Sequence, residues 1–169
     1  MVAIVTKPEI EFTSKAQSVA YKKVFDYLSG SKLFQNSVRA DHVQPKFDLL
    51  HDGTMVEVEV LPWEKNPWDH NNLAVVRAQS YITIGSAMQA ELMQFLLSEN
   101  SKMRFGAFHL DDANQVVFAE SILGGENMDM MELQTCILSV VTIARNYDDL
   151  LVGKFGGQSA IADKVTQSA

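Results

Sequence analysis

Apolar and polar residues recur with two different periods along the chain, and each change of period marks a new element. Within residues 14–30, apolar side chains return every three or four positions and a glycine follows, as in a helix with one buried face. Residues 55–60 alternate instead between apolar side chains and glutamates, which is the period of a half-buried strand. Residues 52–53 are Asp-Gly, which suits a two-residue type I′ turn. The pattern predicts a helix followed by a hairpin of residues 47–50 and 55–60.

The same two periods continue through the rest of the chain. They predict a strand over 73–84, a helix from 85 to about 100, strands over 103–110 and 115–123, and a long helix over about 128–152. Short turns between strands favour antiparallel pairing. We therefore expect an α+β domain with the order α-β-β-β-α-β-β-α, an antiparallel five-stranded sheet with helices packed on it. The length predicts one domain, over residues 13–157, with an arm at 1–12 and a tail at 158–169.

Two regions carry more apolar residues than one core needs. The helix is apolar almost all round over residues 136–144, and the last two strands are apolar on both faces. A second subunit or a bound peptide would cover this surplus; the alternative is a deep core closed by the chain's own arms. Phe105 and Phe118 are therefore candidate partner-binding residues. Val140 and Ile143 are the candidate dimer interface.

One segment is unusual for its aromatic content. Residues 61–72 hold both tryptophans, Trp63 and Trp68, and each directly follows a proline. Proline limits backbone freedom and tryptophan offers a large apolar face, a combination favoured at recognition sites. Both are candidate partner-binding residues, with the alternative that the two indoles fold back as lids on the core.

Composition narrows the classes of partner. The chain has 169 residues, 47% of them hydrophobic, and a net charge of −7. An acidic protein is poorly suited to general binding of nucleic acid or anionic membranes. No uninterrupted apolar stretch approaches the roughly 18 residues of a membrane span, and residues 2–5 are too short for a signal peptide. We expect a cytoplasmic protein without membrane insertion.

Candidate chemistry is sparse. The single cysteine, Cys136, excludes an internal disulfide framework and lies in an apolar run typical of a buried thiol. The histidines show no metal-ligand spacing, and no nucleophile has a credible base partner. Glu57 and Glu59 lie two apart on the polar face of a strand, where we expect solvated carboxylates. The glycines within 153–157 follow a helix and are expected to end it, not to hold phosphate. We expect no catalytic residue, metal or cofactor.

The second half of the chain carries a set of glycines, aromatics and acidic turns that resembles the YbjN family, whose fold is that of the type III secretion chaperones. The matching residues are Phe105-Gly106-Ala107-Phe108, Asp111-Asp112, Ser121-Ile122-Leu123-Gly124, Ala144 with Tyr147-Asp148, and Phe155-Gly156-Gly157. The resemblance spans about residues 15–157 and is strongest from 103 onward. It implies a protein without catalytic machinery, in a fold associated with dimers that hold extended segments of partner proteins. The Pro-Trp segment is not part of the family pattern.

Together, these observations predict a non-enzymatic chaperone- or adaptor-like homodimer with a protein or peptide client. A partner segment would dock on the sheet or its edge, with backbone hydrogen bonds adding affinity and apolar pockets adding selectivity. The alternative is a regulatory protein that senses a small apolar ligand in a pocket between sheet and helices.

Overall fold

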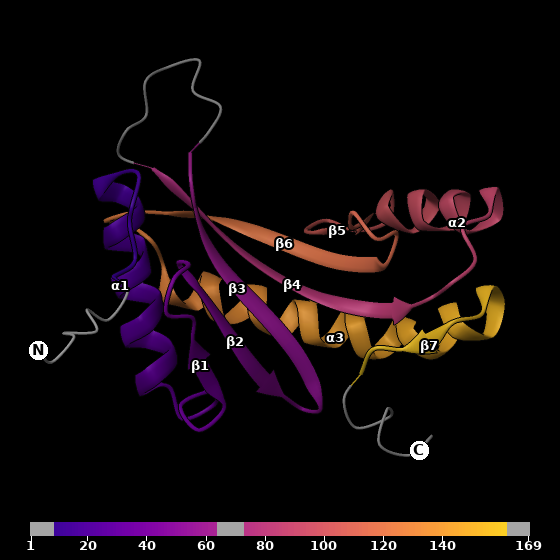
Figure 1. The fold of residues 1–169 in the computed structure, drawn as a ribbon, viewed down its shortest axis with the longest axis horizontal. Helices are drawn as coiled ribbons and strands as arrows, with labels where there is room; N and C mark the ends of the chain where they lie inside the picture. Colours follow the sequence, from indigo (N-terminus) through magenta and orange to yellow (C-terminus); the bar gives the residue numbers. More distant parts are fainter. Residues whose placement is uncertain (1–8, 64–72, 162–169) are drawn as a thin grey trace, which may run out of the picture.

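A computed structural model of the protein describes residues 9–63 and 73–161. One antiparallel sheet forms a layer with strand order β1-β2-β3-β4-β6-β5, and β7 pairs with the end of β4 (Figure 1). The elements are α1 (Lys15–Gly30), β1 (Val38–Ala40), β2 (Lys46–His51), β3 (Thr54–Pro62), β4 (Ala74–Ile84), α2 (Ala90–Asn100), β5 (Ala107–Leu110), β6 (Val116–Gly124), α3 (Met130–Phe155) and β7 (Gln158–Ser159).

The β2–β3 hairpin confirms the clearest sequence prediction. Asp52 and Gly53 both have positive φ, 47° and 72°, as a type I′ turn requires. Beyond the turn, Val56, Val58 and Val60 are fully buried while the residues between them are not. The strand therefore has one face in the core and one face away from it.

Helix α1 begins with a capping arrangement that its sequence encodes. The hydroxyl of Ser14 accepts a hydrogen bond from the backbone N–H of Gln17 at 3.1 Å, and Gln17 Oε1 accepts from the N–H of Thr13 at 2.9 Å. Gln17 Nε2 then donates to the carbonyl of Val60 at 2.8 Å. The same side chain thus starts the helix and fastens it to β3.

Helix α3 lies across the sheet and packs against β3, β4 and β6 (Figure 1). Helix α2 joins it through Phe95, whose ring centroid is 5.6 Å from that of Phe155, and through Glu99, which accepts a 2.6 Å hydrogen bond from Tyr147. Most apolar residues in the middle of α3 are buried within the protomer, namely Cys136, Ile137, Val140, Val141 and Ala144. Leu138 and Ile143 in the same stretch are half-buried.

The structure corrects the expected topology at several points. Over residues 9–63 and 73–161 the sheet has seven strands, not five, because β1 and β7 were not predicted. These strands have three and two residues, too few to show a period. Helix α2 begins at Ala90, not near residue 85, because its N-cap Gln89 is still extended. Strand β5 begins at Ala107, not at 103, since the preceding Gly106 has a φ of +69° that no regular strand adopts.

The chain beyond α3 packs back on the domain. Ser159 donates a 2.7 Å hydrogen bond to the carboxylate of Asp148, and Ile161 is fully buried. In the part of the chain that the structure describes, no helix is both long and apolar enough to cross a membrane.

Candidate functional site

One face of the sheet carries no helix among residues 9–63 and 73–161. All three helices described lie on the opposite side, so the side chains that alternate with the core residues point away from the protein interior. We call this side the open face. Its composition decides what it can contact.

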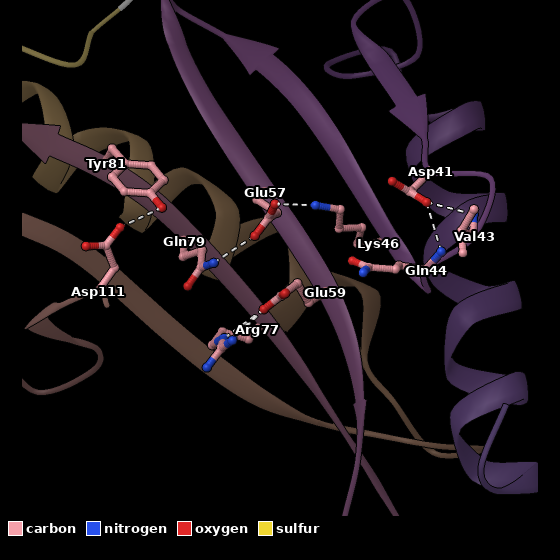
Figure 2. A network of polar contacts seen from close by, with 10 residues as sticks. All are labelled: Asp41, Val43, Gln44, Lys46, Glu57, Glu59, Arg77, Gln79, Tyr81 and Asp111. Atoms are coloured by element: carbon pink, nitrogen blue, oxygen red, sulfur yellow. Dashed lines mark hydrogen bonds and ion pairs between the residues drawn. The ribbon is translucent and has the colours of Figure 1, made fainter. Parts of the chain in front are cut away.

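A ladder of polar pairs crosses the centre of the open face (Figure 2). Glu57 accepts from Lys46 Nζ at 2.9 Å and from Gln79 Nε2 at 2.7 Å, so its carboxylate links β2, β3 and β4. On the next row, Glu59 accepts from Arg77 at 2.5 and 3.0 Å. The hydrogen bond that Lys46 donates to Glu57 raises the pKa of Lys46, so its ammonium group stays charged near neutral pH.

These pairs differ from the sequence expectation. Glu57 and Glu59 were expected to be solvated, but both are half-buried and engaged with neighbouring strands. The pairing neutralises the centre of the open face. On the same face Asp48 lies opposite Glu57 and Arg39 lies opposite Asp48, so this region carries acidic and basic side chains in equal number.

A second polar contact on the open face joins β4 to the turn that follows β5. Tyr81 Oη donates to Asp111 Oδ2 at 3.0 Å (Figure 2). Tyr81 is on β4 and Asp111 follows β5, so this bond passes over β6 at Val117, which is directly opposite Tyr81 and only 2% exposed. Bonds from backbone N–H groups, first that of Gln115, hold the pKa of Asp111 below its usual range. The acceptor of the Tyr81 hydroxyl is therefore ionised.

Apolar side chains lie at both ends of the ladder. Leu50 and Met55, opposite each other near the hairpin turn, are 42% and 49% exposed. At the other end Leu61, Val75 and Leu123 form one row across β3, β4 and β6. The open face thus has a neutralised polar centre between two apolar margins.

The structure separates the residues that the sequence singled out. Phe118 is fully buried, with its ring centroid 5.2 Å from that of Phe108, and Val140 is fully buried against the sheet. Neither can contact a partner from inside the core, so both expectations are corrected. Ile143 is half-buried on α3. Phe105, which precedes β5 in the chain, is 74% exposed.

Of the two tryptophans, the structure describes only Trp63; Trp68 lies outside the described residues. Trp63 is half-buried and directly follows Pro62, the last residue of β3. Pro62 pairs with Ala74 of β4, and Ala74 pairs on its other side with Gly124 of β6. Trp63 therefore lies at the end of the sheet where β6 also finishes.

That end of the sheet also contains a cavity of about 500 Å³. It lies where α1 and α3 begin and β6 ends, and its lining includes Ala16, Val19, Leu123, Met128 and Glu132. Apolar side chains and carboxylates both line it. The cavity is large enough to hold one or two side chains.

Within the described ranges, no group of three or more His, Cys, Asp and Glu side chains is placed to hold a metal ion. Cys136 is buried, and burial raises the pKa of its thiol to about 12. The thiol is therefore protonated at neutral pH, and Cys136 belongs to the apolar core.

Comparison with known proteins adds the family. The family model TY-Chap1, described as T3SS (YopN, CesT) and YbjN peptide-binding chaperone 1, matches residues 36–163, well over half of the chain. The chain belongs to this family. The resemblance to YbjN proteins found in the sequence is therefore confirmed. No curated protein matches the chain.

Sequence reasoning missed most of the open face. The partners of Glu57 and Glu59 come from strands whose register was not predicted, although an alternation of Glu, Arg and Gln with buried valines and alanines was visible in both β3 and β4. Tyr81 and Asp111 are 30 residues apart and gave no local signal.

Proposed function

We propose that this protein is a peptide-binding chaperone or adaptor that holds an extended segment of a client polypeptide without changing it chemically. The match to a peptide-binding chaperone family over residues 36–163 carries the proposal. The architecture supports it, because a single sheet with one face free of helices, in the part described, offers backbone edges and apolar margins to an extended chain.

The test is binding of short synthetic peptides. An array of overlapping segments from proteins of the native cell would be probed with the purified protein, and positive segments measured in solution by fluorescence anisotropy. We expect a subset of apolar segments to bind with micromolar Kd and to be recovered unchanged by mass spectrometry. Failure of every segment to bind, or cleavage or modification of those that do, would refute the proposal.

We also propose, from the sequence, that the protein is a cytoplasmic homodimer. Ile143, half-buried on α3, and the exposed Met131 on the same helix are available to an interface, whereas the buried Val140 is not. A stable dimer should bury at least about 1,000 Å². Light scattering at micromolar concentration should give twice the protomer mass, and a monomer throughout would contradict this proposal. Nothing in the family match supports the alternative of a small-ligand sensor.

A further inference from the structure

Strand β6 is paired along only half of its outer edge. Asn100 donates to the carbonyl of Phe108 at 3.0 Å and accepts from its N–H at 2.7 Å, so both backbone groups of Phe108 point away from β6. Antiparallel strands alternate between residues that face the partner and residues that face away. Because Phe108 is opposite Phe118, it is Val117 and Ala119 whose backbone groups face β5.

The same alternation continues to the end of β6. Ser121 and Leu123 direct their N–H and carbonyl groups to the β5 side, but β5 begins at Ala107, opposite Ala119 (Figure 1). Among the described residues, no strand lies beside Ser121 and Leu123. We call residues 121–123 the free edge. It is a template for one more strand.

Apolar rows reach the free edge from both faces of the sheet. Leu123, 54% exposed, ends the open-face row of Leu61 and Val75. Ile122, on the opposite face, continues the buried row of Val76 and is itself half-buried. A strand added here would extend both rows, and a chain continuing past Leu123 would reach the cavity that this leucine lines.

A buried carboxylate lies where the free edge begins. Glu120 is 8% exposed on the helix-covered face, hydrogen-bonded to Ser139 of α3, and its Oε2 has no hydrogen-bond partner among the described residues. On an added strand, the residue opposite Ile122 projects on the same face as Glu120, and a long side chain spans such a diagonal. Burial raises the pKa of Glu120, and a cation placed beside Oε2 would stabilise its charged form.

We propose that the free edge binds the client by strand addition, and that the client segment is apolar with a lysine or arginine whose side chain reaches Glu120. This inference rests on the proposed function and adds the place and the chemistry of the client. The hydrogen bonds come from Ser121 and Leu123, the apolar contacts from Ile122 and Leu123, and the cavity takes a side chain that follows.

A second copy of the chain is a poorer occupant. The protein carries a net charge of −7, and pairing two free edges would place two Glu120 carboxylates near each other without a cation. At the outer edge of β5, Asn100 already binds the outward backbone groups of Phe108. Strand β1 is the edge at the opposite end of the sheet, where the backbone groups of Val38 and Ala40 face outward because Ser37 and Asp41 bond to β2. It offers three residues and no buried carboxylate.

Proline substitutions distinguish binding at the free edge of β6 from binding at β1. At Ser121 a proline removes an N–H that makes no bond within the sheet, so the fold is retained while one client bond is lost. Ser121→Ala keeps the N–H, and Ala40→Pro makes the same change at β1. With fluorescent peptides about six residues long, the length of an ordinary strand, we expect Ser121→Pro to weaken binding about tenfold. Ser121→Ala and Ala40→Pro should bind as the parent does.

Two side-chain variants keep the test valid if Ser121→Pro does not fold. Leu123→Asp should weaken binding about tenfold or more, whereas Leu97→Asp, which changes a 70% exposed leucine on α2, should not. The parent protein should prefer a peptide with one lysine over the same peptide with glutamate. Glu120→Gln should lower the ratio of affinities for the lysine and glutamate peptides about tenfold.

Each outcome decides the proposal or its premise. If no peptide binds the parent protein, the proposed function itself fails. If peptides bind but Ser121→Pro and Leu123→Asp bind equally well, or Ala40→Pro alone abolishes binding, the assignment to β6 is wrong. If light scattering shows a dimer that Ser121→Pro converts to a monomer, the occupant is a second copy and the proposal is overturned.

Discussion

The glycine before β5 gives the sharpest test of the packing that leaves the edge of β6 open. Gly106 has a φ of +69°, and a Cβ there would lie 2.6 Å from Cζ of Phe118 and 2.8 Å from the carbonyl oxygen of Ala119. The left-handed backbone costs an L-residue about 1–2 kcal/mol. Overpacking of a fixed site adds about 1–3 kcal/mol. We expect Gly106→Ala to lower the free energy of unfolding by about 2–5 kcal/mol.

The matched control is Gly85→Ala. Gly85 has a similar φ of +73°, but nothing lies within 4 Å of its added Cβ. This variant carries the backbone cost alone, so it should lose about 1–2 kcal/mol. Both free energies come from urea denaturation followed by far-UV circular dichroism. If the two variants lose the same amount, Gly106 does not approach Phe118 and Ala119 as described, and the argument for the short β5 fails.

Three further predictions follow from the packing and the pKa shifts. Phe118→Ala should lower the free energy of unfolding by about 3–5 kcal/mol in denaturant melts. A loss below about 1 kcal/mol would contradict the burial of Phe118 in the core. Native protein at pH 8 should leave Cys136 unmodified by a thiol reagent until denaturant is added, because its pKa is raised to about 12; prompt labelling would contradict its burial. Asp111 has a lowered pKa, so its stabilising contribution is present above the usual value of about 3.9 and is lost as the pH falls through the folded-state pKa. Asp111→Asn should therefore destabilise the protein at neutral pH, with the difference shrinking in acid; a difference independent of pH would exclude this account.

Local pattern determined most of the secondary structure. The three- and four-residue spacing of α1 and α3 and the alternation of β3 each report one buried face, a property that a helix or strand carries within itself. The Asp52-Gly53 turn is equally local, because positive φ at two adjacent residues depends on those residues. The glycine and aromatic pattern of the second half also indicated the family.

Tertiary structure decided which apolar residues form the core and which backbone groups stay unpaired. Sequence alternation marks both faces of β6 as apolar, but only the positions of α3 and Tyr81 show that Phe118 and Val117 are covered within the protomer. The free edge depends on where β5 starts, and β5 starts only after Gly106, which has a positive φ and lies close to Phe118 and Ala119 of β6. Register, edges and cross-strand pairs join residues far apart in the chain, and no local period records such distances.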